Sequence, residues 1–530
     1  MSAGELSEGG TLPPILLEEP PNKELGDFAT NFAMQSARIF HQPPKKIAEI
    51  LGTHITGSWL DHAEVAGPGF LNFYLKKDVI ADTLRDILRT GENYGALPPK
   101  DLPPIQVEYV SANPTGPLHV GHGRGAAVGS ALVKLLRKAG YEVQSEYYVN
   151  DAGKQMDLLA ISVNARYLER LGQKIVFPEN GYHGADIIDT AQRIIDRDGD
   201  RYLALSEEER LEKFKDIAYK EKLAVLREDL ADFRVTFDRW FSERTLHPEA
   251  VQRVVDVLLE RGTAYEKDGA VWLRSTDYGD DKDRVIFRDN GVPTYLAADI
   301  AYHDDKYRRG YGRLINIWGA DHHGYIARLK AAVHFLGYDE SRLEIILMQM
   351  VNLLKDGQTY KMSKRAGNAI LMSDVLAAIG RDAMRFIFIS KKGETPLEFD
   401  VDELAREDSS NPIFYINYAH ARVNQIFTKA GKCEADVLGA DFGALDEAGL
   451  GLAFAALSLN EILNDAFNSR GLQKLPDFLK ALAADFHKYY NENRVVGSEN
   501  EDAKLKLFAL VALSIRTAFA LMGLSAKEKM

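Results

Sequence analysis

A glycine-rich loop between two regular segments most constrains what this chain can fold into. Residues 105–110 have the apolar character of a strand, and residues 111–121 are rich in glycine and proline. Apolar residues then recur at helical spacing over residues 123–138, and residues 141–149 indicate a second strand. A strand, a helix and a second strand in this order form a βαβ unit, so we expect a parallel sheet covered by helices.

The α/β pattern extends over the middle of the chain, and segments with a different pattern precede and follow it. We predict a multidomain α/β protein. Its parts are a small N-terminal α+β domain (1–95), a Rossmann-like catalytic domain (96–405) with a helical insertion (about 156–260), and a C-terminal all-α bundle (406–530). Within the middle domain, further strands are expected at 270–273, 284–287 and 314–318.

Composition excludes several classes of protein. The 530 residues carry a formal net charge of -13, which argues against a nonspecific nucleic-acid binder. The single cysteine, Cys433, excludes an internal disulfide framework and a cysteine-based zinc site. No signal peptide is recognisable and no apolar run is expected to span a membrane, so we expect a cytoplasmic protein. The basic residues in 306–313 could form an RNA-binding patch or a solvated loop face.

Two histidines stand where the glycine-rich loop enters the helix. In open parallel sheets ligands bind at the carboxyl ends of the strands, and a helix N-terminus favours phosphate. Glycines at 121, 123 and 125 would let a ligand approach the backbone closely. We therefore predict a phosphate-binding loop, with a turn holding two incidental histidines as the alternative. The motif comprises Ala112, Asn113, Pro114, Thr115, Gly116, Pro117, Leu118, His119, Val120, Gly121 and His122.

A dinucleotide-binding fingerprint is the nearest rival interpretation of this loop. That fingerprint places Gly-x-Gly-x-x-Gly directly after the strand. Here a long loop intervenes, and the third glycine position is occupied by Ala126.

A second basic motif lies about 240 residues downstream, at Lys361, Met362, Ser363 and Lys364. Two lysines three residues apart in a loop can neutralise charge that develops on a triphosphate. An exposed basic loop would explain this motif equally well if it stood alone. Its position after the His-Val-Gly-His tetrapeptide makes the combination specific.

The two motifs together resemble the signatures of class I aminoacyl-tRNA synthetases, and further segments narrow the resemblance to the arginine-specific branch. The match extends over nearly the whole chain, although the N-terminal domain is abbreviated before Gly26. The segments that resemble this branch are 26–31, 67–70, 107–113, 147–153, 237–241, 280–285, 294–296 with Asp299, 319–324, 382–385 and 411–422.

The resemblance implies an arginine–tRNA ligase. This activity joins L-arginine to tRNA(Arg) through an arginyl-adenylate made from ATP. The ATP would bring Mg²⁺, with no tightly bound cofactor and no metal cluster, and we expect a monomer. By resemblance, His119 and His122 with Lys361 and Lys364 are catalytic. The residues expected to bind ATP are His119, Gly121, His122, Gly123, Lys361, Met362, Ser363 and Lys364.

Arginine presents five N–H donors and no acceptor, so its pocket needs carboxylates and hydroxyls. Tyr295 and Asp299 are four residues apart, and on a helix both would point the same way. Asn150 and Asp151 could belong to the pocket or terminate a strand as a turn. The residues implied to bind arginine are Glu108, Ser111, Asn113, Tyr295, Asp299 and His322.

Several aromatic residues could serve either binding or packing. Tyr109, Tyr147 and Tyr148 could stack on bases or pack in the core. The aromatic residues between 486 and 490 could contact anticodon bases or fill the bundle.

Two rival functions remain beside the arginine-specific enzyme. The cysteine-specific class I enzyme is one, but it holds zinc with cysteines. A non-catalytic paralogue is the second, against which the intact histidine and lysine motifs argue.

Overall fold

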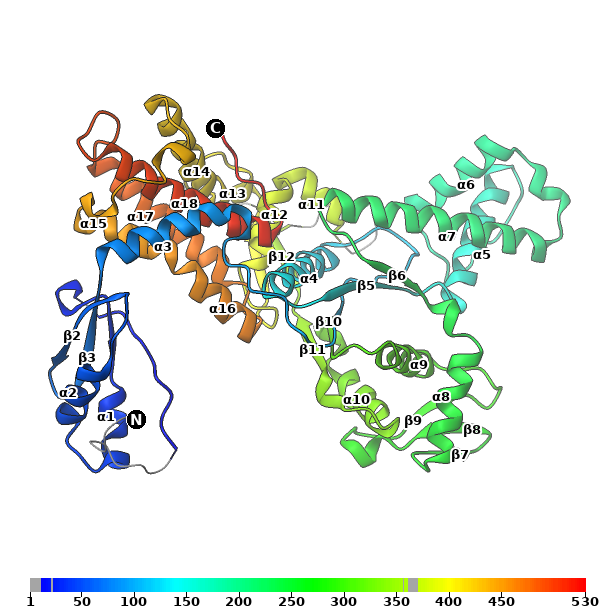
Figure 1. Ribbon diagram of the computed structural model, residues 1–530. Coiled ribbons are helices and arrows are strands. Elements are labelled where there is room, and N and C mark those ends of the chain that lie inside the picture. The colour runs from blue at the N-terminus through cyan, green and yellow to red at the C-terminus, as the bar shows by residue number, and fades with distance from the viewer. Residues whose placement is uncertain (1–10, 21, 356, 361–369) are drawn as a thin grey trace. The chain divides into compact units, whose positions relative to one another are not determined.

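The computed structural model describes residues 11–20, 22–355, 357–360 and 370–530 (Figure 1). The chain divides into two compact units. One unit contains Met1–Tyr94, Arg422–Ala456 and Phe486–Leu513; the other contains Gly95–Ala421, Leu457–Asp485 and Ser514–Met530.

The second unit is built on a five-stranded parallel sheet in the order β11-β10-β4-β5-β6. The strand order reverses between β4 and β10, which makes this position a topological switch point. The sheet confirms the predicted Rossmann-like class. Its strands are β4 (Ile105–Glu108), β5 (Val143–Val149), β6 (Arg239–Ser242), β10 (Arg313–Gly319) and β11 (Leu343–Met348).

Successive side chains along β4 and β5 point to opposite faces of the sheet, and the two faces differ in character. Val107 and Tyr147 point to the face covered by α4 (Val120–Lys138), whereas Glu108 and Glu146 pair in register on the opposite face. That face is covered by α9 (Tyr295–Arg308), whose hydrogen bonds reach both carboxylates. Two glutamates can be buried here because α9 supplies cations and hydroxyls.

The expected helical insertion differs from the structure at one point. Helices α5 (Lys154–Arg170), α6 (Ala185–Asp198) and α7 (Glu207–Asp232) are helical as predicted and share a core around Phe214. The segment 239–242, however, is strand β6, which adds an edge to the sheet beside β5. Four residues are too few to show a strand period against a charged helical background.

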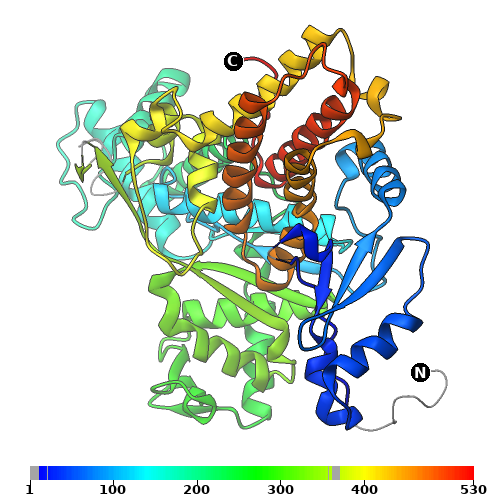
Figure 2. The ribbon, with the colours of Figure 1, turned by 90° about the vertical axis from the view of Figure 1, so that its left-hand side faces the viewer.

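The structure confirms the strands predicted at 270–273 and 284–287 and adds the sheet to which they belong. Both exist, as β8 (Ala270–Leu273) and β9 (Arg284–Phe287), but with β7 (Ala264–Lys267) they form a separate antiparallel sheet. This sheet shares a core with α8 (Glu249–Glu260), α9 and α10 (Ile326–Phe335). In Figure 1 and Figure 2 this green segment gathers on one side of the parallel sheet.

A third sheet follows the last strand of the parallel sheet. It has the order β13-β12-β14; α11 and α12 pack against α4, and α13 packs against α11 and β12. The bounds are β12 (Val351–Lys355), β13 (Gln358–Thr359), β14 (Leu397–Asp400), α11 (Met372–Ile379), α12 (Arg381–Ile389) and α13 (Val401–Ala405).

The first unit contains the predicted N-terminal α+β fold. A three-stranded antiparallel sheet, β1-β3-β2, packs on two helices through a core around Phe32 and Ile47. The elements are β1 (Phe28–Thr30), α1 (Phe32–Phe40), α2 (Pro44–His54), β2 (Leu60–Ala66), β3 (Phe70–Leu75) and α3 (Lys77–Thr90).

From Val401 onward the chain is helical, as predicted. The long helices are α14 (Pro412–Ala430), α15 (Glu447–Leu457), α16 (Leu459–Ser469), α17 (Lys474–Glu492) and α18 (Glu501–Met522). Contrary to the expectation from the sequence, α18 is long and apolar enough to cross a membrane. Since 89% of its apolar window is buried inside the protein, α18 is a core helix.

Candidate active site

A cavity of about 410 Å³ opens at the switch point of the parallel sheet. Its walls come from the segments that follow β4, β10 and β11 and from the first turn of α4. Ligands of open α/β sheets bind at this position. The lining residues include Ser111, Asn113, His119, Gly121, His122, Trp318, His322 and Gln349.

The backbone at the end of β4 is strained where it enters the cavity. Val110 and Ser111 both have positive φ angles, 68° and 42°. A β-branched residue adopts this conformation rarely, and such strain concentrates at functional sites. The Ser111 hydroxyl holds the turn in place by accepting a hydrogen bond from the Tyr148 backbone N–H at 3.1 Å.

The two histidines cap α4 and stack on each other, with ring centroids 3.5 Å apart. His119 Nδ1 accepts from the Gly121 backbone N–H at 3.1 Å, and His122 Nδ1 accepts from the His119 backbone N–H at 3.3 Å. With each Nδ1 acting as acceptor, the proton of each neutral ring resides on Nε2. Both Nε2 atoms are therefore hydrogen-bond donors at the cavity.

Burial keeps both imidazoles neutral. It lowers the pKa of His119, against the opposing charge of Asp321, and lowers the pKa of His122 to about 3, with further help from His119. Neutral rings donate one hydrogen bond each without contributing a full charge. The positive character of the site comes instead from the N-terminus of α4.

The glycines of this turn have different roles. A Cβ on Gly121 would lie 3.0 Å from the His119 ring, so this glycine permits the histidine cap. Gly125 lines the cavity and has open space around it. A Cβ on Gly123 would lie 3.1 Å from the Met372, Met384 and Phe388 side chains, and Gly123 is not among the residues that line the cavity.

The lysine motif, Lys361, Met362, Ser363 and Lys364, lies outside the described residues. The chain that follows it is attached directly to the histidine turn. The Val120 N–H donates to Ile370 O at 2.9 Å, and the Met372 N–H donates to Leu118 O at 2.8 Å. The segment after the motif is thus held beside the cavity by backbone hydrogen bonds.

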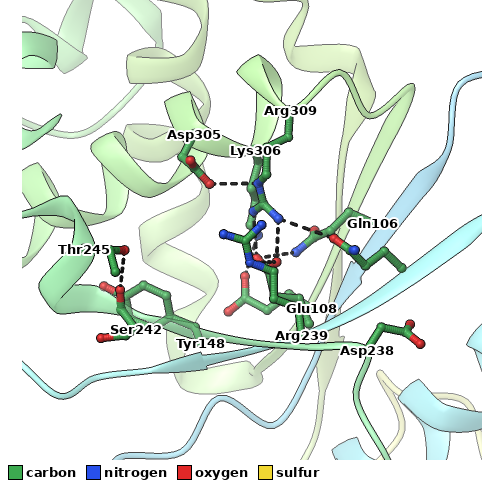
Figure 3. Close-up of polar contacts among 12 residues, drawn as sticks. Gln106, Glu108, Tyr148, Asp238, Arg239, Ser242, Thr245, Asp305, Lys306 and Arg309 are labelled. Atoms are coloured by element: carbon green, nitrogen blue, oxygen red, sulfur yellow. Dashed lines mark hydrogen bonds and ion pairs between the residues drawn. The ribbon is translucent and has the colours of Figure 1, made fainter.

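A buried polar network lies on the other face of the sheet. Lys306 is fully buried and donates to Glu108 Oε2 at 2.5 Å and to Asn316 Oδ1 at 2.9 Å. Figure 3 shows Lys306 and Arg309 reaching from α9 toward Gln106 and Glu108 on the sheet. Arg309 binds both oxygens of Glu146, at 2.6 and 2.8 Å. Burial acts to raise the pKa of Glu146, but Arg309 outweighs it and the pKa is lowered.

Asp299 is the carboxylate that lacks such a cation. Its Oδ2 accepts from the Tyr325 hydroxyl at 2.5 Å, and within the described chain no lysine or arginine lies within 4.0 Å of it. Burial raises the pKa of Asp299 to about 7; the Tyr325 bond lowers it, and the charges of Glu108 and Glu243 raise it further. A bound cation would relieve this cost.

Glu243 is a residue that the sequence analysis missed. It follows β6, is 5% exposed, and lies 3.3 Å from His247 Nε2. Burial raises the pKa of Glu243 as well. An acidic residue at the carboxyl end of a strand would have been the signal, but β6 was assigned to the helical insertion.

Asn150 and Asp151, which could either belong to the pocket or end a strand as a turn, differ in their surroundings. In its satisfied orientation the Asn150 amide donates to Glu243 at 2.8 Å and lies 3.2 Å from the Asn113 side chain. Asp151 is structural, because it accepts from the Ser242 and Tyr219 hydroxyls at 2.7 and 3.0 Å.

The remaining expected residues are only partly brought together. Tyr295 begins α9 one turn before Asp299, and its side chain is 55% exposed. His322 lines the cavity, 3.5 Å from Asp321 Oδ2. Glu108, Asp299 and Glu243 are close enough to influence Tyr148 together.

The aromatic and basic residues of uncertain role mostly pack inside the protein. Tyr109, Tyr147 and Tyr148 are buried, and so is Phe486, whereas Tyr490 is half-buried under Arg422. The stretch 306–313 forms neither a basic patch nor a loop face as a whole, because Lys306 and Arg309 pair with the buried glutamates.

Three family models match successive parts of the chain. They are the arginyl tRNA synthetase N-terminal domain over residues 3–75, the class I (R) tRNA synthetase catalytic domain over 83–427, and the DALR anticodon binding domain over 416–530. The parallel sheet with its switch-point cavity and paired histidines is accordingly a class I aminoacyl-tRNA synthetase catalytic domain.

Individual relatives agree with this class. An arginine–tRNA ligase of Campylobacter concisus is 51% identical over 520 residues, covering 97% of each chain. A solved structure from Campylobacter jejuni, 51% identical, matches with a TM-score of 0.82 over 86% of this chain and all of that one. The Thermus thermophilus arginyl-tRNA synthetase shares the fold, with a TM-score of 0.74 at 21% identity over 97% of this chain and 96% of that one.

The chain belongs to the arginyl-tRNA synthetase family. It is an arginine–tRNA ligase, an enzyme that uses ATP, arginine and tRNA as substrates.

Proposed function

We propose that His119 and His122 bind the phosphates of ATP. We further propose that the arginine side chain lies against the carboxylates Asp299, Glu243 and Glu108. The observation that supports the first assignment best is the orientation of the two rings. Their Nδ1 atoms are occupied by backbone N–H groups, so two Nε2 donors are available at the N-terminus of α4. Phosphate oxygens are the acceptors that such a position favours.

The charge balance of the carboxylates supports the second assignment. Glu108 and Glu146 are compensated by Lys306 and Arg309, whereas Asp299 and Glu243 have raised pKa values. A guanidinium would supply the missing positive charge and enough donors for several oxygens. In this proposal Asp299 is the main partner, and Glu243 and the free lone pairs of Glu108 complete the site.

The other roles follow from position. Ser111, Asn113 and His322, which line the cavity, would contact the remainder of arginine, and Gly121 would let ATP approach the backbone. Tyr295, one turn before Asp299 on α9, would contact arginine beside that carboxylate. Lys361 and Lys364, with Met362 and Ser363, would close on the leaving pyrophosphate. We further propose that Mg²⁺ accompanies ATP, that the enzyme is a monomer, and that it acts in the cytoplasm.

The reaction would proceed in two displacements. The arginine carboxylate attacks the α-phosphorus of ATP, and pyrophosphate leaves with its electron pair. The terminal 2′-hydroxyl of tRNA then attacks the arginyl carbonyl and loses its proton, and AMP leaves. The imidazoles contribute by positioning the phosphates and stabilising charge that develops on them.

The proposal is tested by a pair of substitutions at the two ends of the site. His122→Ala should lower the rate of adenylate formation by about a hundred- to thousandfold while leaving arginine affinity nearly unchanged. Asp299→Asn and Glu108→Gln should do the reverse: each should cost about thirtyfold or more in arginine affinity and reduce the preference for arginine over neutral citrulline.

The measurements are aminoacylation kinetics and equilibrium binding of arginine and of citrulline. Glu344→Gln is the matched control, because Glu344 pairs with Arg313 and Arg470 at the opposite end of the sheet. If His122→Ala weakens arginine binding with a normal chemical step, or if the carboxylate variants keep the parent's preference, the assignment is wrong.

A further inference from the structure

The end of the last helix, α18, is held by cations from the catalytic sheet and its helices. Arg385 on α12 is fully buried, and its hydrogen bonds go to uncharged oxygens in three other segments. Nε donates to Met522 O at 2.7 Å, one Nη to Phe233 O at 2.9 Å, and the other to Ser130 Oγ at 2.7 Å. Ser130 belongs to α4, the helix whose first turn carries the two histidines.

Two further cations converge on the same helix end. Lys134, one turn after Ser130 on α4, donates to Ala520 O at 3.2 Å. Arg234 donates to Gly523 O at 3.0 Å and to Ser525 Oγ at 2.5 Å, and it also pairs with Asp382 at 3.0 Å. The carbonyls at a helix C-terminus carry the negative end of its dipole, so this end of α18 favours the three cations gathered there.

Gly523 leaves room for the Arg385 side chain at the end of α18. It follows α18 with a φ of +73°, and a Cβ there would lie 2.7 Å from the guanidinium of Arg385. Because Arg385 is fully buried and bonded to α4, any side chain at 523 must displace it. All of these residues belong to the same compact unit.

We propose that Arg385, with Lys134, is a positioning residue that fixes α4 against the C-terminal end of α18, so that the last helix of the chain helps set where the histidine turn meets ATP. The proposal rests on the phosphate-binding role assigned to His119 and His122. It assigns Arg385 no contact with substrate. A rigid helix transmits a displacement along its axis, and small misplacements at a reacting centre cost a large part of the rate.

The test compares two glycine substitutions with the same backbone cost. Gly523→Ala adds a methyl group to a residue in the left-handed conformation, and that methyl group would clash with Arg385. Gly431→Ala, after α14, has the same conformation with φ +68° but open space around its Cβ. We expect Gly523→Ala to lower kcat for ATP–pyrophosphate exchange, measured with arginine and tRNA present, by about ten- to a hundredfold. The KM for arginine and the Kd for tRNA should stay within about twofold, and Gly431→Ala should behave like the parent.

A second variant covers the case in which Gly523→Ala fails to fold. Lys134→Met keeps the aliphatic packing on α4 and removes only the bond to Ala520 O, and it should lower kcat in the same direction. The effects of Gly523→Ala and Lys134→Met on kcat should be non-additive in the double variant, because both changes act on the contact between α4 and the end of α18. Arg385→Lys should recover part of the rate lost in Arg385→Met.

The inference is overturned if Gly523→Ala and Gly431→Ala have equal kcat, if the Gly523 and Lys134 effects are simply additive, or if the loss lies in tRNA affinity. His122→Ala distinguishes this failure from that of the proposed function. If His122→Ala forms adenylate at the normal rate, the histidines do not bind phosphate and the proposed function is wrong, whatever result the glycine variants give.

Discussion

At the scale of single residues, the site depends on the environment given to each ionisable group. His122 stays neutral because it is buried, and Glu146 stays charged because Arg309 binds it. Burial raises the pKa of Asp299 to about 7, since it outweighs the lowering effect of the Tyr325 hydrogen bond. Residue types alone do not fix these states. Burial and neighbouring charges do.

The pKa of Asp299 predicts a pH dependence for arginine binding. Arginine stays protonated throughout the accessible range, and it pairs with the charged carboxylate. Since the pKa of Asp299 is about 7, arginine affinity should rise about tenfold per pH unit below 7 and level off above it. Calorimetric titration with arginine from about pH 5.5 to about pH 8.5, on either side of that pKa, measures this.

The Asp299→Asn variant serves as the control for that titration. Its arginine affinity should be weak and nearly independent of pH over the same range. A parent enzyme with flat affinity across pH 7 would show that Asp299 does not face the guanidinium.

At the scale of elements, α4 joins the cavity to the core through glycines on different faces. A Cβ on Gly129 would lie 2.3 Å from the buried ring of Tyr109, whereas Gly125 has open space and faces the cavity. Both glycines weaken the helix, so alanine would stabilise it by roughly 0.5–1 kcal/mol if space allowed.

The two substitutions should therefore have opposite effects. Gly129→Ala should destabilise the protein by about 1–3 kcal/mol through overpacking. Gly125→Ala should raise the melting temperature slightly while increasing the KM for ATP, because its methyl group enters the cavity. Denaturant unfolding and ATP kinetics measure the two effects. Equal stability changes in the two variants would contradict this account of α4.

At the scale of the whole molecule, sequence domains and compact units follow different boundaries. Residues 514–530 lie in the compact unit of the catalytic sheet, where Arg385, Arg234 and Lys134 bind the end of α18. Removing 407–530 would leave the fully buried Arg385 without its acceptor Met522 O, and would expose the core residues that pack on α18. One unsatisfied buried polar group costs about 1–3 kcal/mol. That loss is a large share of the stability of an ordinary domain, about 5–15 kcal/mol.

We therefore expect the fragment 1–406 to be aggregated or to lack a cooperative unfolding transition. Deletion of residues 528–530 alone, which are exposed, should leave stability unchanged. Size-exclusion chromatography and circular dichroism melting check both outcomes. A monodisperse fragment 1–406 that melts like the parent would show that the C-terminal helices are dispensable for the catalytic fold.

The sequence alone determined the class of fold and the activity, because local signals carried them. A βα unit with a glycine-rich loop predicts a parallel sheet, and the ordered motifs from Asn113 to Lys364 identify the family. The histidine turn was also predictable, since it occupies a strand end and a helix start that the pattern makes visible.

Tertiary structure alone decided the partners of those residues. Sequence spacing cannot show that Lys306 neutralises Glu108, 198 residues away, or that Glu243 joins the cluster from the end of a four-residue strand. Nor can it show that a Cβ on Gly123 would meet side chains of α11 and α12. These contacts depend on burial between elements distant in the chain, and the energy of a charge is set by what the fold places beside it.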